Sequence, residues 1–328
     1  MPNQNVSTYS PQVSKPAMLT TGSIHSETNI SLLEKSQRFE FITSVCAFNF
    51  VYGADFQKWR ETRQVTGFQN SGVDPVALAT ACKLVADSRR ITVLTGAGIS
   101  TDSGIPDFRG PKGLWTLNPD AERAATLRHY LDDHELRKRS WQNRIKWIGG
   151  DPQPNAGHRA LFELEKRNVL VALITQNVDE LHQRAGHDPS KVLEVHGTLH
   201  RTCCWSCKDR RPMAQALARV IAGDPDPRCE LCDGILKSDT ILFGQPLDQD
   251  VMARALDAST NCEVFIAVGS SLSVFPAANT LPRAKNSGAK VIIVNGQSTE
   301  MDHYADVVVN SEISEVLPQI CGVVKSRP

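Results

Sequence analysis

Short apolar runs alternate with segments of helical periodicity along most of the chain. The runs are rich in β-branched residues and lie at 91–95, 169–175, 263–268, 290–294 and 306–309. Helical spacing of apolar residues recurs at 75–90, 156–167, 248–259 and 276–286. The first of these helices is predicted to begin at the Asp74-Pro75 pair, which is typical of a helix N-terminus. Strands that alternate with helices predict a parallel sheet covered on both faces, the doubly wound, Rossmann-like α/β class.

The residues after the first apolar run contain a glycine-rich turn. Ligands of doubly wound sheets bind beyond the carboxyl ends of the strands. Gly96 and Gly98 of the sequence GAGISTDSGIPDFRG, residues 96–110, would let the backbone approach a pyrophosphate closely. Thr101 replaces the third glycine of the dinucleotide fingerprint, and no acidic residue follows the next strand at the usual distance of about 20 residues. A hydride-transferring Rossmann enzyme is therefore disfavoured.

Small or polar residues follow four further apolar runs. In chain order these are Gln176, Asn177 and Asp179; His196; Gly269, Ser270 and Ser271; and Asn295, Gly296 and Gln297. Each group alone has an ordinary structural interpretation, because Asn and Asp are common in turns and a single histidine can be a buried structural residue. Together they favour one nucleotide site over several unrelated turns.

Five of the nine cysteines lie within 30 residues and include the sequences CWSC and CELC. Two such CxxC pairs, 21 residues apart, fit a tetrahedral site of four thiolates. A redox pair or two disulfides are the alternatives, and both are disfavoured because an intracellular chain keeps such thiols reduced unless a metal holds them. Cys203 is an extra thiol outside the CxxC spacing. We predict one structural zinc ion bound by Cys204, Cys207, Cys229 and Cys232.

Charge and hydropathy narrow the possible partners. The chain has 36 Lys and Arg residues and 36 Asp and Glu residues, which argues against binding of DNA or anionic membranes by bulk electrostatics. No run approaches about 18 consecutive apolar residues, and the N-terminus does not resemble a secretory signal. We expect a cytoplasmic protein with no membrane and no direct nucleic-acid partner. The Ser-, Thr- and Asn-rich first 30 residues make the mitochondrial matrix the alternative, and residues 1–70 are predicted to be a partly disordered extension.

Several motifs occur in an order that resembles one known family. GAGIS, SGIPDFRG, GLW, TQNVDELH, EVHG, the two CxxC pairs, VGSSLSVFP and IIVN follow one another between residues 75 and 320. This set resembles the sirtuins, which are NAD-dependent protein lysine deacylases, and the long 115–147 insert resembles their class II branch. The resemblance implies a Rossmann-like NAD-binding domain over 71–196 and 240–328 and a small zinc-binding module over 197–239. NAD and an acyl-lysine would enter the cleft between them from opposite sides.

The same resemblance implies a role for each residue after the strands. His196 would be the general base that activates a ribose hydroxyl, a task that suits an imidazole because its pKa lies near working pH. Asn177 would position ribose or water, and Asp179 would hold the nicotinamide carboxamide. Further NAD contacts would come from Gly96, Ala97, Gly98, Thr101, Asp107, Phe108, Arg109, Trp115, Gln176, Gly269, Ser270, Ser271, Asn295, Gly296, Gln297 and Ile313.

The implied reaction is deacylation of protein lysines with release of nicotinamide and O-acyl-ADP-ribose. The substrate backbone would pair as a strand between residues 243–245 and 274–275. Gln245 stands where the family often has an acid. Tyr130 and Arg137 do not have the three-residue separation of the pair that recognises succinyl or malonyl groups in one branch, so a dedicated desuccinylase is not expected.

Two other functions fit the same residues. A protein mono-ADP-ribosyltransferase would use the same NAD site, with a protein side chain or water in place of the acyl group. A zinc-ribbon protein could instead bind NAD as a sensor or scaffold without turnover, but it would not need His196 beside the cleft.

Overall fold

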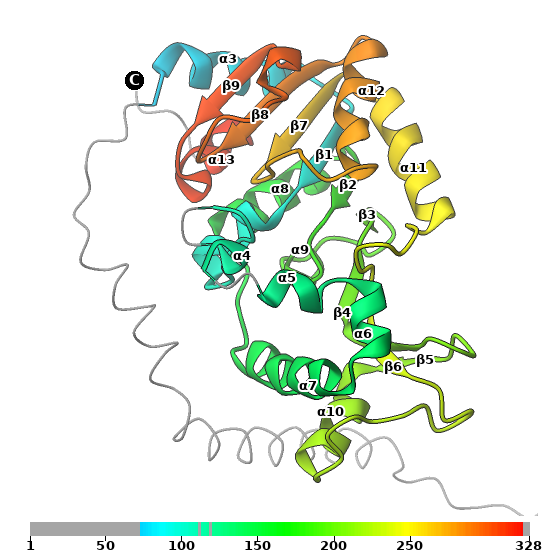
Figure 1. The fold of residues 1–328 in the computed structure, drawn as a ribbon. Coiled ribbons are helices and arrows are strands. Elements are labelled where there is room, and N and C mark those ends of the chain that lie inside the picture. The colour runs from blue at the N-terminus through cyan, green and yellow to red at the C-terminus, as the bar shows by residue number, and fades with distance from the viewer. Residues whose placement is uncertain (1–72, 111–112, 118–119, 324–328) are drawn as a thin grey trace, which may run out of the picture. The chain divides into compact units, whose positions relative to one another are not determined.

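The computed structural model describes residues 73–110, 113–117 and 120–323, and a parallel sheet organises the larger part of them (Figure 1). Six strands pair in the order β3 (Val192–Glu194), β2 (Leu170–Thr175), β1 (Ile91–Thr95), β7 (Val264–Val268), β8 (Lys290–Asn295) and β9 (Val307–Asn310). Every neighbouring pair is parallel. The strand order reverses between β1 and β7, at the switch point where doubly wound sheets bind ligands. The predicted fold class is therefore confirmed.

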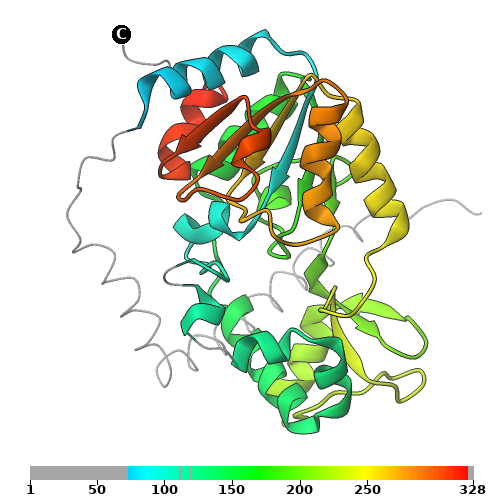
Figure 2. The same ribbon diagram turned by 45° about the horizontal axis from the view of Figure 1, so that its top comes forward.

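Alternate residues of the strands pack against helices on opposite faces of the sheet. Val93 and Ile266 belong to a buried cluster with side chains of α3, α8 and α13, whereas Leu94 and Phe265 belong to a second cluster with α11 and α12. The bounds are α3 (Pro75–Asp87), α8 (Ala156–Lys166), α13 (Ile313–Ile320), α11 (Gln249–Thr260) and α12 (Thr280–Asn286). Figure 2 shows α11 and α12 side by side on one face. Because both faces are covered, all of β1 is buried, and such strands read as continuous apolar runs.

Helix α3 begins where the Asp-Pro pair predicts. The Asp74 carboxylate accepts a hydrogen bond from the Val76 N–H at 2.9 Å. Pro75 occupies the first turn, where its missing N–H leaves no hydrogen bond unmade. The helix ends at Asp87 rather than at residue 90, because Ser88 has an extended backbone that leads into β1.

A smaller antiparallel sheet lies between β3 and β7 in the chain. Its order is β5 (Arg210–Pro212), β4 (Gly197–Cys204) and β6 (Leu236–Thr240), and α10 (Met213–Ile221) packs on β4. The core of this small module contains Cys204, Met213, Leu217 and Leu236. The module occupies the part of the chain in which the sequence predicts zinc binding.

The segment between α4 (Leu114–Leu117) and α8 forms three helices, two of which contact the small module. They are α5 (Asp120–Ala124), α6 (Leu127–Asp132) and α7 (His134–Gly149); α6 and α7 make the contacts with the module, and α5 packs on α6 and α7. Trp141 of α7 is fully buried in the module's core, and the Tyr130 hydroxyl donates to the Leu236 carbonyl at 3.0 Å. The Arg137 Nε lies 3.0 Å from Asp226 Oδ2, with both side chains buried. The insert noted in the sequence is thus fastened to the small module.

Short elements complete the described chain. They are the 3₁₀ helices η1 (Ala97–Ser103), η2 (Ala277–Asn279) and η3 (Asp302–Tyr304), and the helix α9 (Leu181–Arg184). In the described ranges, no helix combines the length and apolar character needed to cross a membrane. The predicted extension over residues 1–70 lies outside the described residues.

Candidate active site

The turns after β1 and β7 pack backbone against backbone at the switch point. The Gly96 N–H donates to the Val268 carbonyl at 3.0 Å, and the Gly98 N–H donates to the Gly269 carbonyl at 2.8 Å. A Cβ at Gly98 would lie 2.8 Å from the Gly269 Cα, closer than side-chain carbons approach in proteins. Gly269 has a positive φ of 63°, which favours glycine. These glycines therefore let the two turns meet, a packing role that adds to the predicted approach of a ligand.

A buried polar cluster lies directly behind this glycine turn. The Ser100 hydroxyl is fully buried and donates to Asp179 Oδ2 at 2.7 Å. Asn177 Nδ2 lies 3.2 Å from both Ser100 Oγ and the Gly96 carbonyl. Burial raises the pKa of the Asp179 carboxyl. The structure brings Asn177 and Asp179 together as expected, and it adds Ser100, whose place inside the GAGIS motif is the sequence signal for it.

His196 follows β3 and has a defined tautomer. Its Nδ1 lies 3.1 Å from the Gln176 carbonyl oxygen, which can only accept a hydrogen bond, so Nδ1 carries the proton. The lone pair of Nε2 then remains for another proton. Burial lowers the pKa of this imidazole below its ordinary value, which keeps the ring neutral near pH 7. The next residue, Gly197, has a φ of 73°, and a Cβ there would lie 2.0 Å from the Asp239 carbonyl oxygen.

Three of the predicted strand-end groups are joined through Ser270. Gln176 Nε2 donates to Ser270 Oγ at 2.9 Å, and Asn295 Nδ2 donates to the Ser270 carbonyl at 2.6 Å. Gln176 and Ser270 follow β2 and β7, and Asn295 is the last residue of β8. Ser271 is exposed, and its hydroxyl contacts Ser273 instead. Three further predicted contacts lie apart from this network, since Gly296 and Gln297 are exposed and the Ile313 side chain is buried in the core.

Aromatic side chains order the loop between η1 and α4. The ring centroids of Phe108 and Trp115 are 4.7 Å apart, and those of Trp115 and Phe243 are 5.5 Å apart. The Arg109 guanidinium lies over the Trp115 ring at 4.5 Å. Asp107 Oδ1 accepts from the Gly110 N–H at 3.1 Å and so shapes the turn. The predicted Phe108, Arg109 and Trp115 thus form one cluster with Phe243.

Two predicted residues of η1 have backbone surroundings. The Thr101 hydroxyl donates to the Gly98 carbonyl at 3.0 Å, and this bond closes the first turn of η1. Ala97 starts η1 and is partly exposed. Ala97 lies between the two glycines of the turn, and Thr101 directly follows Ser100 of the buried cluster.

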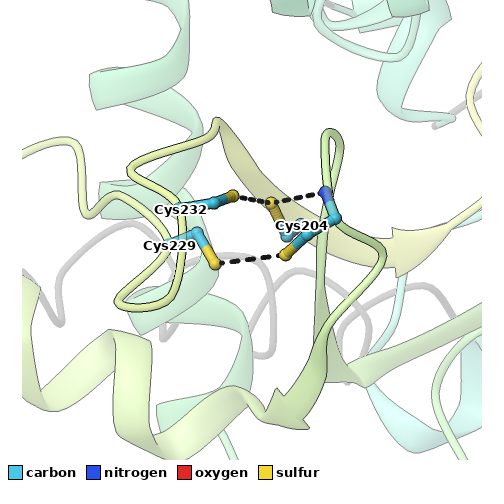
Figure 3. Close-up of side chains that lie close together, drawn as sticks. Cys204, Cys229 and Cys232 are labelled. Atoms are coloured by element: carbon cyan, nitrogen blue, oxygen red, sulfur yellow. Dashed lines mark hydrogen bonds between the residues drawn. The ribbon is translucent and has the colours of Figure 1, made fainter.

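Four cysteines of the small module converge on one point (Figure 3). The sulfur atoms of Cys204, Cys207, Cys229 and Cys232 all lie within 4.8 Å of one another. The Cys204–Cys232 and Cys207–Cys229 sulfur pairs are 3.5 and 3.6 Å apart, too far for disulfides. Zn–S bonds of about 2.3 Å in a tetrahedron place sulfurs about 3.8 Å apart, so this arrangement fits zinc. The Cys203 thiol does not join this group and donates to the Cys204 carbonyl. The predicted zinc site is therefore confirmed.

Comparison with known proteins decides the family. A family model described as the Sir2 family matches residues 96–276, which include the glycine turn, His196 and the four cysteines. The chain belongs to the Sir2 family. It is 47% identical over 230 residues to NAD-dependent protein deacetylase 2 of Streptomyces coelicolor, and the match covers 70% of this chain and 95% of that protein. The predicted resemblance to the sirtuins is therefore confirmed.

Solved Sir2 structures share this fold. One Sir2 enzyme superposes with a TM-score of 0.68 at 37% identity and covers 75% of this chain and 97% of its own. A second Sir2 structure contains a deacetylated p53 peptide and 3′-O-acetyl-ADP-ribose; it gives a TM-score of 0.68 at 31% identity, with 75% and 98% covered. Both comparisons cover nearly the whole of the other chain.

Two residues of the 115–147 insert, Tyr130 and Arg137, make contacts inside the protein. Tyr130 is fully buried against the small module, and Arg137 forms the buried ion pair with Asp226 and donates to the Tyr130 and Leu131 carbonyls. The sequence predicts no role for either residue. They hold the insert on the small module, a role that their spacing along the chain does not signal.

Proposed function

We propose that this chain is an NAD-dependent protein lysine deacylase that transfers the acyl group to ADP-ribose. The observation that carries the proposal is the neutral His196, with a free Nε2, beside a buried amide and carboxylate at the switch point. The deacetylase named among its relatives and the Sir2 complex with a deacetylated peptide and acetylated ADP-ribose support it.

The residues present fit NAD. The Gly96 and Gly98 N–H groups are occupied by the Val268 and Gly269 carbonyls, and the 3₁₀ helix η1 that begins at Ala97 brings its N-terminal end to this edge of the sheet, where a negatively charged pyrophosphate is favoured. Asp179 offers a partly buried carboxylate to a carboxamide N–H, and Gln176, Ser270 and Asn295 form a connected polar group at the carboxyl ends of three strands. When bound, NAD supplies a glycosidic bond whose cleavage releases nicotinamide and opens the ribose carbon to the acyl oxygen.

Each proposed catalytic residue has a defined task. His196 Nε2 accepts the proton of a ribose hydroxyl, and its Nδ1–H stays on the Gln176 carbonyl so that the ring keeps its orientation. Asn177 positions ribose or water, because its amide is held by Ser100 and Gly96. The Ser100 hydroxyl steadies the Asp179 carboxylate. Phe108, Arg109 and Trp115 cover the nicotinamide-ribose side of the site.

Domain roles follow from this assignment. We assign NAD binding to residues 71–196 and 240–328 and zinc binding to residues 197–239, with residues 1–70 as an extension. The zinc ion is structural, because four thiolates leave no open coordination position.

The substrate is an acyl-lysine in a protein or peptide. No nucleic-acid partner is assigned, because the formal net charge of the chain is zero. The cytoplasm is the assigned compartment, in keeping with four reduced thiols that hold a metal.

The test is an activity assay with a matched histidine control. Purified protein is incubated with NAD and acyl-lysine peptides, and nicotinamide, deacylated peptide and O-acyl-ADP-ribose are measured by mass spectrometry. His196→Ala is expected to lose all three products and still bind NAD in calorimetry. His303→Ala is the control, because His303 Nδ1 also contacts a backbone carbonyl, that of Glu300, but lies exposed.

The two competing functions give different products. Nicotinamide without deacylated peptide, together with ADP-ribose attached to protein, would establish the transferase in place of the deacylase. NAD binding with no turnover of any acyl-lysine peptide, in zinc-loaded folded protein, would establish the sensor.

A further inference from the structure

Two segments that carry the proposed catalytic residues are fastened side by side. Residues 176–180 follow β2, and residues 196–200 follow β3. Three contacts between them end on backbone carbonyls: His196 Nδ1 to Gln176 at 3.1 Å, the Leu199 N–H to Val178 at 2.9 Å, and His200 Nε2 to Asp179 at 3.3 Å. The fourth joins two side chains, because the Thr198 hydroxyl donates to Glu180 Oε1 at 2.7 Å.

We propose that Thr198 and Glu180 are positioning residues that set His196 at its working distance from Asn177 and Asp179. This inference rests on the proposed function. Neither residue belongs to the groups that are proposed to touch NAD or substrate. They act through the register of the two segments, because the base lies on one segment and the ribose- and carboxamide-binding side chains lie on the other.

Thr198 is suited to this role by its burial and by its single hydroxyl. The residue is fully buried, and its Oγ also accepts from the His200 N–H at 3.1 Å. A hydroxyl has one proton to donate, and here that proton goes to the Glu180 carboxyl. A carboxyl oxygen is a good acceptor, and the donor–acceptor distance of 2.7 Å is that of a well-formed O–H···O bond. The bond therefore ties the backbone of the His196 segment to the loop.

Glu180 has a backbone conformation that needs support. Its φ of 56° and ψ of 18° lie in the left-handed region, which is costly for a residue with a side chain. The loop turns into α9 at this residue, and Asp179 Oδ1 accepts from the Leu181 N–H at 3.0 Å just beyond it. The orientation of the Asp179 carboxylate therefore depends on how Glu180 is held.

The surrounding charges define the conditions for a test. Burial raises the pKa of the neighbouring Glu194 carboxyl to about 7, with Glu180 and Asp179 raising it further and Arg201 opposing them. Gln183 Nε2 donates to Glu194 at 3.0 Å. Assays at pH 8, above the Glu194 pKa of about 7, keep most of this carboxyl ionised, and Glu180→Met removes a charge that raises this pKa, so the variants differ little in its protonation.

The kinetic test removes the hydrogen bond from either side. Thr198→Val keeps the shape of the side chain and removes the donor, and Glu180→Met removes the acceptor from a partly exposed position. Each is expected to lower kcat for deacylation by about 10- to 100-fold, as for a small misplacement of catalytic groups, with the KM for peptide little changed. Thr198→Ser and Glu180→Gln keep a donor and an acceptor and are expected to stay within about threefold of wild type.

A second readout needs neither NAD nor turnover. Ligand-free protein is labelled with ¹⁵N-histidine and studied by NMR, and the His196 signals are assigned by comparison with His196→Ala. The His196 ring of wild type is expected to show the Nδ1–H tautomer and a lowered pKa. Thr198→Val and Glu180→Met should give mixed tautomers and a pKa closer to the ordinary value. Wild-type kcat and an unchanged His196 spectrum in both folded variants would overturn the inference. If the wild-type protein lacks deacylase activity but the two variants still show these spectral changes relative to wild type, the proposed function is refuted. The positioning role of Thr198 and Glu180 then stands.

Discussion

Gly98 and Gly269 lie in contact through their backbones, and this contact joins the two central strands of the sheet at the point where they reach the candidate active site. The Gly98 N–H donates to the Gly269 carbonyl at 2.8 Å, and a Cβ at Gly269 would lie 2.4 Å from the Ile99 nitrogen. The same residues were expected from the sequence only as a surface for NAD. The close contact of the two turns already requires glycine at both positions, and this steric requirement exists without a ligand.

Gly98→Ala should therefore destabilise the protein itself. The added Cβ would lie 2.8 Å from both the carbonyl oxygen and the Cα of Gly269, so one of the two turns must move, at a cost of about 1–3 kcal/mol. Chemical denaturation measures this cost. Gly296→Ala is the matched control for stability, because a Cβ there meets nothing within 4 Å. Equal unfolding free energies for the two variants would contradict the steric argument.

Deacylase activity should persist in mildly acidic solution. Burial lowers the pKa of His196 below the ordinary histidine value of about 6.5, so the ring stays neutral, and able to accept a proton, at pH values where a free histidine is already charged. The acid limb of the kcat/KM profile should lie below pH 6.5. A limb at or above that pH would show that His196 is not the ionising base or that it is more solvated than in this structure.

Protein stability should fall as the pH decreases from about 6.5. Burial lowers the pKa of His158 to about 3, and burial also lowers the pKa values of His182 and His187. The unfolded chain therefore binds protons that the folded chain does not, and each such histidine contributes up to about 1.4 kcal/mol per pH unit between its two pKa values. Asp179 and Glu194 have raised pKa values, that of Glu194 about 7, and contribute with the opposite sign, so the net fall comes from the three histidines outweighing the two carboxyls. Urea unfolding of wild type and His158→Gln between pH 7 and 5 should show the smaller slope in the variant.

Removal of zinc should unfold the small module. Cys204 and Cys229 lie in the same buried cluster as Trp141 and Leu217, so loss of the ion separates residues that also form the core. Metal analysis should find one zinc ion per chain in wild type and in Cys203→Ser, and less in Cys229→Ser. Tryptophan fluorescence should change in Cys229→Ser alone. Full zinc content in that variant would exclude Cys229 as a ligand.

The buried Arg137–Asp226 ion pair should contribute more to the unfolding free energy than the exposed ion pairs of the protein do. Both side chains are more than 90% buried, so Arg137→Met leaves a buried carboxylate with only His134 beside it and should cost about 3–5 kcal/mol of unfolding free energy. The double variant Arg137→Met/Asp226→Leu should recover much of this loss. Lys83→Met, which breaks an exposed pair with Asp87, should leave the unfolding free energy nearly unchanged, because solvent screens such a pair. Similar losses for the buried and exposed single variants would refute the argument.

The parallel sheet could be predicted because its strands are buried on both faces. Ile91–Thr95 and Val264–Val268 therefore appear in the sequence as runs of apolar and β-branched residues without alternating charged positions. The zinc cysteines could be predicted because each CxxC pair is a local pattern that needs no knowledge of the fold. The residues after the strands could be found because the carboxyl ends of parallel strands share one edge.

The insert and the small module could not be derived in the same way. Helix α7 carries many charged residues, and its buried Trp141 packs against Cys204 and Met213, which are more than 60 residues further along the chain. Tertiary contacts of this kind leave no periodic signal. Ser100 and Thr198 were missed for a related reason, since a hydroxyl becomes informative only when its partner, Asp179 or Glu180, is known.

The pairing of β1 with β7 also bears on how the protein is made. Residues 91–95 emerge from the ribosome long before residues 264–268, and the whole zinc module is synthesised in between. During that interval the edge of β1 that will receive β7 stays open, and an unpaired strand whose residues are all buried in the finished fold is prone to associate with other chains. Factors that slow translation or withhold zinc during synthesis should therefore lower the yield of folded protein more than they lower the stability of the finished molecule.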